Sequence, residues 1–102
     1  MDAVAAAIAQ PHRRAILGLI ANAELSAGEI AGHFDTTRPA ISQHLAVLRS
    51  AGLVTERRAG TRRYYRARPE GLTGLREWLD RFWRDGLEQL RTEAEREAKR
   101  AR

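Results

Sequence analysis

The sequence has no cysteine, and this absence excludes two kinds of chemistry. Disulfide bonds and thiolate metal sites both require cysteine, so neither can form. Long apolar runs are also missing, because no stretch approaches the roughly 20 residues that span a bilayer as a helix. The apolar start of the chain carries Asp2 and lacks the basic segment that opens a secretory signal. We therefore expect a cytoplasmic protein without a membrane partner.

Histidine is scarce, and its distribution argues against a metal site or a catalytic centre. The three histidines, His12, His33 and His44, fall on three different predicted helices, and residues 69–102 contain none. This spacing offers no local pair of ligands for zinc or a related metal. The serines stand at capping, exposed or helix-end positions with no obvious base beside them, and a serine nucleophile needs such a base. We predict that the protein is not an enzyme and has neither a metal nor a cofactor.

Acidic residues are nearly absent from the middle third of the chain. Residues 36–68 hold eight arginines and one acid, Glu56, which gives a formal charge of +7. Residues 1–35 give −2, and residues 69–102 balance eight basic against eight acidic groups. A segment whose charges are nearly all positive indicates a polyanionic partner, whereas an ordinary solvated surface carries both positive and negative charges.

The length of 102 residues corresponds to a single domain, residues 1–102. Apolar periodicity, proline and capping signals predict five helices, at residues 2–9, 11–21, 26–34, 38–50 and 69–98. Ser26 and Glu29 have the spacing of a capping box, and Thr37 is the expected N-cap of the fourth helix, with Pro39 in its first turn. The tail after Leu90 has no apolar face, so we expect it to fray.

Two short strands are predicted between the fourth and fifth helices. Gly52 stands where a helix C-terminus favours a left-handed residue. Residues 54–58 and 62–67 read as strands around a turn at residues 59–61. The chain is therefore mainly α with a small β-hairpin, in the order of a winged helix-turn-helix, with the core and its wing at residues 9–68. This shape suits a DNA groove and its phosphates.

The fourth predicted helix offers a polar face near its N-terminus. Its apolar stripe of Ile41, Leu45 and Leu48 turns inward, and recognition helices present their N-terminal residues to base edges. Arginine can bridge guanine, glutamine can pair with adenine, and serine can contact a base or a phosphate. The residues of this helix that we predict to lie at DNA are Thr36, Thr37, Arg38, Pro39, Ser42, Gln43, His44 and Arg49. Capping alone also explains Thr37, and a place at the edge of the core also explains His44.

The hairpin is the predicted wing. Arginines flank its tip, and most of them should contact phosphates, which adds affinity without sequence preference. One of the two tyrosines should pack inward while the other reaches the DNA backbone. The predicted DNA-binding residues of the wing are Arg57, Arg58, Thr61, Arg62, Arg63, Tyr64 and Tyr65.

Four ordered segments of the chain resemble the ArsR/SmtB family of bacterial transcription regulators. They read PHRRAILGLI, ELSAGEIAGHF, TRPAISQHLAVLRSAGLV and RRAGTRRYYRARPEGL, and the resemblance covers roughly residues 9–90. It implies a repressor that binds double-stranded DNA as a homodimer, with two recognition helices in successive major grooves of an inverted repeat. Exposed polar residues at the step from Ser42 to Gln43 match DNA-contacting positions of the family.

The resemblance also implies that the first and last helices form the dimer interface, with residues 69–98 as the dimerisation helix. The expected interface residues are Val4, Ile8, Leu72, Leu75, Trp78, Leu79, Phe82, Trp83 and Leu87. Many relatives sense metals through cysteines before the recognition helix or through histidines on the last helix, and this chain has neither. A small-molecule effector stays open. The alternatives are a winged-helix protein-interaction module and a MarR-like regulator.

Overall fold

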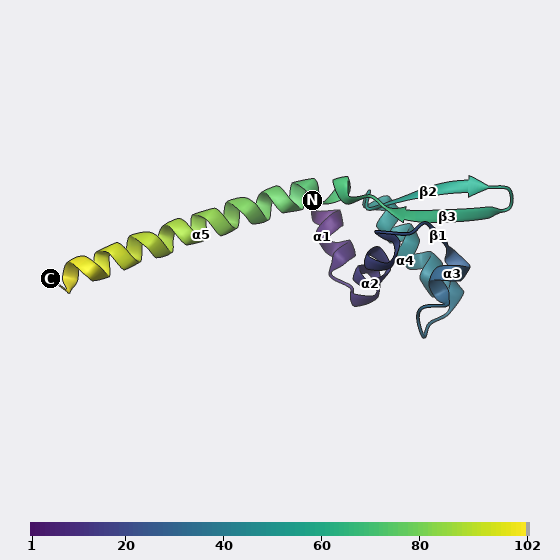
Figure 1. The fold of residues 1–102 in the computed structure, drawn as a ribbon, viewed down its shortest axis with the longest axis horizontal. Helices are drawn as coiled ribbons and strands as arrows, with labels where there is room; N and C mark the ends of the chain where they lie inside the picture. The colour runs from purple at the N-terminus through teal and green to yellow at the C-terminus, as the bar shows by residue number, and fades with distance from the viewer. Residues whose placement is uncertain (102) are drawn as a thin grey trace.

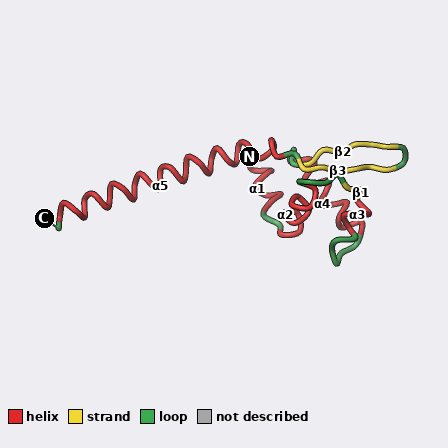
Figure 2. The backbone as a smooth tube through the Cα atoms, in the orientation of Figure 1, coloured by secondary structure: helices red, strands yellow, loops and turns green. Residues whose placement is uncertain are grey.

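The computed structural model describes residues 1–101 and consists of a helical body, a small sheet and one long projecting helix (Figure 1). The elements in chain order are α1 (Asp2–Ile8), α2 (Pro11–Ile20), β1 (Leu25–Ser26), α3 (Ala27–Ala31), α4 (Arg38–Ser50), β2 (Val54–Ala59), β3 (Arg62–Ala67), the 3-10 helix η1 (Pro69–Leu72) and α5 (Thr73–Arg100). Figure 2 shows that α5 leaves the body alone, opposite the tip of the hairpin formed by β2 and β3. The molecule is therefore elongated, with extents of 73 × 25 × 22 Å.

The short helix α1 is tied to α2 by two arginine side chains. The last carbonyls of a helix have no partner within it. Arg13 Nε donates to the Ala7 carbonyl at 2.6 Å, and Arg14 Nη1 donates to the Ile8 carbonyl at 2.8 Å. These bonds satisfy the end of α1 and fix its direction against α2.

Capping residues begin α3 and α4 where the sequence predicts. Ser26 Oγ accepts from the Glu29 N–H, and the Glu29 carboxylate accepts from the Ser26 N–H, which completes the capping box. Thr37 Oγ1 accepts from the Ala40 N–H at 3.2 Å and starts α4. The predicted helix at residues 26–34 is too long, because α3 ends at Ala31. Gly32 follows directly, and glycine is a poor helix former.

The C-terminus of α4 forms a Schellman motif. The Gly52 N–H donates to the Arg49 carbonyl and the Leu53 N–H to the Leu48 carbonyl, each at 3.0 Å. Gly52 has φ +78°, the left-handed conformation that the sequence predicts for it. Leu53 is buried as a result, and the chain turns sharply from the end of α4 into β2.

The sheet has three antiparallel strands in the order β1-β3-β2, whereas the sequence predicts a two-stranded hairpin. The hairpin closes at the pair Ala59–Arg62, so its turn is Gly60-Thr61, one residue shorter than predicted. Leu25 of β1 pairs with Tyr65 of β3. A two-residue strand has no periodicity to reveal it, and its partner lies 40 positions along the chain.

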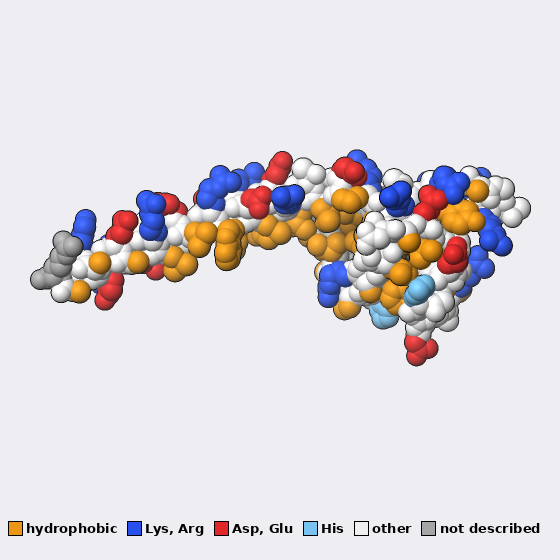
Figure 3. Space-filling view, in the orientation of Figure 1, with side chains coloured by type: hydrophobic (Ala, Val, Ile, Leu, Met, Phe, Trp, Pro, Cys, Tyr) orange, Lys and Arg blue, Asp and Glu red, His pale blue; other side chains and the backbone are white. Residues whose placement is uncertain are grey.

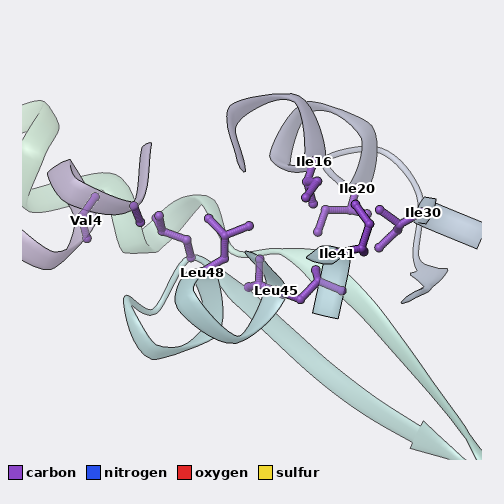
Figure 4. Close-up of a cluster of buried hydrophobic side chains, with 10 residues drawn as sticks. Val4, Ile16, Ile20, Ile30, Ile41, Leu45 and Leu48 are labelled. Carbon is purple, nitrogen blue, oxygen red and sulfur yellow. The ribbon is translucent and has the colours of Figure 1, made fainter. Parts of the chain in front are cut away.

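The hydrophobic core lies between α2, α3 and α4 and extends to α1 (Figure 4). Branched aliphatic side chains fill it, and its largest fully buried members are Ile16, Ile20, Ile30, Ile41, Leu45, Leu48 and Leu53. The predicted stripe of α4 is therefore confirmed as its inward face. This packing holds α4 with its opposite side in solvent.

The last helix differs from its prediction at both ends. Residues 69–72 form the separate 3-10 helix, and α5 continues to Arg100 instead of fraying after Leu90. Arg91 lies 3.4 Å from Glu88 and 3.7 Å from Glu95, so ion pairs along the helix support its tail. No residue of α5 is buried. Within residues 1–101, no helix combines the length and apolar composition needed to cross a bilayer.

Candidate nucleic-acid interface

The first two turns of α4 present a polar face to solvent. Arg38, Pro39, Ser42 and Gln43 are all exposed, because the core stripe of α4 directs the opposite side outward. The long helix α5 projects away from this face and does not cover it (Figure 1). The predicted base-reading side chains are therefore accessible.

A groove of about 530 Å³ lies between the starts of α3 and α4 and the tip of the wing. Its lining residues are Ser26, Ala27, Gly28, Glu29, Arg38, Ser42, Thr61, Arg62, Arg63 and Tyr65. Arg38 stands at one wall and Arg62 with Arg63 at the other. The fold therefore brings together two arginine sites that lie more than 20 residues apart in the chain.

The groove contains one acid, Glu29, whose carboxylate is committed to the cap of α3. The hydrogen bonds from the Ser26 backbone and hydroxyl lower the pKa of Glu29, and the charge of Arg62 adds to the effect. The other charged groups that line the groove are the arginines. Its net charge is thus positive, which favours a phosphate backbone.

The arginines of residues 36–68 divide into two groups. Some are paired within the protein: Arg57 Nη2 lies 2.6 Å from Glu24, Arg49 2.8 Å from Glu56, Arg63 3.5 Å from Glu56 and Arg68 4.0 Å from Glu70. Among residues 1–101, no ion pair involves Arg38, Arg58, Arg62 or Arg66. Sequence reasoning missed this division, because Glu24 precedes Arg57 by 33 positions and nothing local links them.

The two tyrosines of β3 lie on opposite faces of the sheet, as alternation predicts. Tyr65 is half-buried, packs against the core and also lines the groove. Tyr64 pairs with Arg57 across the hairpin, and the Arg57 guanidinium lies 5.1 Å from its ring centroid. Arg57 Nε and Nη2 donate to Glu24 Oε1 at 3.0 and 2.6 Å, and this hydrogen bonding raises the pKa of Arg57.

His44 packs toward α2. Its ring is half-buried and stacks on the ring of His12, with centroids 5.8 Å apart. The ring centroids of His12 and Phe34 lie 6.4 Å apart. Burial lowers the pKa of His44, and the charge of Arg13 and the neighbouring His12 lower it further. Of the two interpretations of His44 that the sequence leaves open, this packing favours the edge of the core.

An apolar stripe runs along one side of the half of α5 nearest the body, and Figure 3 shows it as a band of hydrophobic side chains. Phe82 and Trp83 are 65% and 69% exposed, and Trp78 stacks on Phe82 with centroids 5.4 Å apart. The exposed large apolar residues of α5 are Trp78, Leu79, Phe82, Trp83, Leu87 and Leu90. So large an exposed stripe indicates a surface that another chain covers.

The remaining predicted interface residues lie against the body. Val4 is 8% exposed and belongs to the core, and Ile8, Leu72 and Leu75 are half-buried against it. They therefore have less free surface to offer a partner than the stripe of α5. Within residues 1–101, no three histidine, aspartate or glutamate side chains gather as a metal site.

Comparison with known proteins gives several matches. A helix-turn-helix domain family matches residues 8–57. The HTH-type transcriptional regulator Rv2034 of Mycobacterium tuberculosis is 51% identical over 81 residues, which are 79% of this chain and 76% of that protein. The transcriptional repressor SdpR of Bacillus subtilis is 36% identical over 90 residues, 88% of this chain and 100% of that protein.

A solved structure extends the similarity to the fold. It is the homodimeric winged helix-turn-helix DNA-binding domain of a possible ArsR-family transcriptional regulator from Mycobacterium bovis. The TM-score is 0.66 at 33% sequence identity, and the match covers 82% of this chain and 78% of that chain.

Proposed function

This chain belongs to the ArsR/SmtB family of winged helix-turn-helix transcriptional regulators, and on that premise we propose how it binds its operator. It is a homodimeric, sequence-specific DNA-binding repressor whose two α4 helices enter successive major grooves of an inverted repeat. The observation that carries the proposal is the positive groove between the exposed start of α4 and the wing.

Sequence reading belongs to the exposed polar side chains of α4. Arg38, Ser42 and Gln43 stand on the first two turns, where a recognition helix meets base edges. Arg38 suits the O6 and N7 atoms of guanine, and Gln43 suits the N6 and N7 atoms of adenine. Each such pair contributes about 1–3 kcal/mol of discrimination against the wrong base.

Phosphate contacts come from side chains around the groove that remain accessible. These are Thr36, Thr37, Arg58, Thr61 and Arg62, and Pro39 adds only surface contact. Arg63 joins them once its contact with Glu56 is released. Arg49, Arg57 and Tyr64 contribute less, because their polar or aromatic groups already have partners within the protein. Phosphate contacts fix the register of the protein on the duplex and supply most of the affinity.

The apolar stripe of α5 supplies the dimer interface. Trp78, Leu79, Phe82, Trp83 and Leu87 are each 42–69% exposed in one protomer. Packing them against the same stripe of a second copy removes apolar surface from water. Each Å² of apolar surface buried in this way stabilises the dimer by about 25 cal/mol. A two-fold interface of this kind pairs the same patch on both subunits and places two α4 helices symmetrically. Val4 and Ile8 of α1 border this interface.

Footprinting of the protein on the promoter of its own gene tests the proposal. We expect protection of an inverted repeat whose half-site centres lie about 34–36 Å apart along the duplex. Protection that survives excess mixed-sequence competitor duplex would identify this repeat as the operator. A folded dimer that protects no DNA at moderate salt, and is not retained on mixed-sequence duplex, would refute the proposal and favour a protein-interaction module.

A further inference from the structure

Glu56 is the one acidic residue within residues 36–68, and the structure places it between two arginines. Its side chain is 9% exposed, whereas those of Arg49 and Arg63 are 58% and 50% exposed. Two guanidinium groups thus cover one carboxylate and still reach solvent. A charged group with so little exposure is retained only when partners compensate it.

The carboxylate bridges two parts of the DNA-binding surface. Glu56 Oε2 accepts from Arg49 Nη1 at 2.8 Å, and Glu56 Oε1 lies 3.5 Å from Arg63 Nε. Arg49 is in the last turn of α4, and Arg63 is near the tip of the wing on β3. Glu56 itself is on β2, opposite Tyr65, and both Tyr65 and Arg63 line the groove. The bridge therefore connects the reading helix to the groove side of the wing.

This arrangement limits what Arg49 and Arg63 can do at DNA. The negative charge of Glu56 offsets part of the positive charge of each guanidinium, and the contacts through Arg49 Nη1 and Arg63 Nε restrict where each side chain can meet a phosphate. Phosphate contacts raise affinity for every sequence, while base contacts raise affinity for one. The base-facing residues Arg38, Ser42 and Gln43 have no hydrogen bond to Glu56 among the described residues. Restraint of the two arginines thus weakens sequence-independent binding and leaves base reading intact.

We propose that Glu56 is a specificity-determining residue, which holds Arg49 and Arg63 away from the phosphates of non-operator duplex DNA. The inference rests on the proposed function and concerns the regulation of binding at the same groove. Glu56 acts through its two arginines and touches no base. Its loss should strengthen binding to arbitrary DNA more than binding to the operator.

The test compares wild type with Glu56→Gln on two duplexes of equal length, one carrying the protected repeat and one of mixed sequence. Affinity is measured by fluorescence anisotropy between 50 and 200 mM salt. Each additional phosphate contact steepens the slope of log K against log salt by about 0.9. Over this fourfold range of salt, one such contact increases the loss of affinity by a further factor of about 3.5. We expect Glu56→Gln to gain at least one such contact on mixed-sequence DNA relative to wild type. Its ratio of operator affinity to mixed-sequence affinity should fall at least about threefold.

Three further variants separate release of the arginines from other effects. Glu97→Gln, an exposed position near the end of α5, changes net charge equally and should leave slope and ratio at wild-type values. Glu56→Gln/Arg63→Gln should return the slope toward wild type if Arg63 is the released contact. Glu56→Asp keeps the charge but shortens the bridge, so it should steepen the slope even if Glu56→Gln fails to fold.

Each alternative outcome has one meaning. An unchanged slope and ratio in both Glu56→Gln and Glu56→Asp would overturn the inference. Equal loss of affinity on both duplexes would show a merely structural role and would also overturn it. Wild-type protein that binds neither duplex would instead refute the proposed function, so the two failures are distinguishable.

Discussion

His44 on α4 stacks on His12 of α2, with ring planes only 6° apart. The contact joins the reading helix to the helix that precedes the helix-turn-helix pair. An imidazole in ordinary surroundings titrates near neutral pH. Because burial, Arg13 and His12 all lower the pKa of His44, its neutral form is favoured in the folded protein.

Stability should therefore decline as the pH falls below about 6.5, the ordinary pKa of histidine. Between the lowered pKa of folded His44 and this value, the unfolded chain binds the proton more readily, so acid favours unfolding. The contribution of His44 is complete above pH 6.5 and is lost as the pH falls through this window. Thermal melting of wild type and His44→Gln at pH 7.5 and 5.0 measures it.

Wild type should lose more melting temperature on acidification than His44→Gln does. The matched control is His33→Gln, which removes an exposed imidazole outside the stacked pair. Identical pH dependence in wild type and His44→Gln would show that the stacked pair is not a source of acid sensitivity.

Removing one wing arginine should lower the salt dependence of operator binding. Arg62 lines the groove and forms no ion pair among residues 1–101, so Arg62→Ala should reduce the slope of log K against log salt by about 0.9. Arg57→Ala is the matched control on the same hairpin, and its effect should be smaller because Glu24 binds Arg57. A larger change for Arg57→Ala than for Arg62→Ala would reverse our assignment of the two arginines.

A charge in the middle of the α5 stripe should separate the dimer. Trp83 is 69% exposed, and Trp83→Glu would place two unpaired carboxylates in the proposed interface. Each unpaired buried charge costs several kcal/mol, so the dimer dissociation constant should rise at least about 100-fold. Sedimentation equilibrium measures the change. Arg84→Glu adds the same side chain on the opposite side of α5 and should leave the dimer intact.

The direction in which α5 leaves the body depends on Gly71, which lies just before its first turn. A Cβ on Gly71 would overlap the Gly52 carbonyl oxygen and lie 3.1 Å from Leu53 Cδ2. Gly71→Ala should therefore lower the free energy of unfolding by about 1–3 kcal/mol. Operator affinity should fall as well, because the backbone shift changes the direction of α5 from the body.

Gly74→Ala provides the comparison, since a Cβ at Gly74 meets nothing within 4 Å. Alanine is the better helix former, so this variant should gain up to about 1 kcal/mol. Urea unfolding measures both variants. Equal stability of Gly71→Ala and wild type would mean that the chain relaxes at this point without cost.

Local signals predicted the fold well where they were strong. The capping box of Ser26 and Glu29, the N-cap Thr37 and the left-handed Gly52 all lie where their chemistry requires. The exposed start of α4 followed from the inward stripe of the same helix. Such features depend on neighbours within a few residues, which a single sequence contains.

Contacts between residues far apart in the chain could not be predicted from the sequence. Strand β1 is too short for alternation, and it exists because Leu25 finds Tyr65 across the sheet. The pairing of Arg57 with Glu24 likewise depends on tertiary geometry, and a run of like charges gave no sign that several of its arginines are paired with acids. The persistence of α5 to Arg100 was missed because charged pairs along a helix can replace an apolar face.

Because α5 is long, a small rotation at its first turn moves its far end by a large distance. A straight helix of 28 residues is about 42 Å long, so a rotation of about 5° at its first turn moves its far end by roughly 4 Å. Gly71, just before that turn, rests on Gly52, immediately beyond the end of α4. A ligand or mutation that tilts one helix against the other would alter the separation of the two reading helices within the dimer. The half-site spacing that the dimer prefers on DNA would then depend on the angle of α5 at the contact between Gly71 and Gly52.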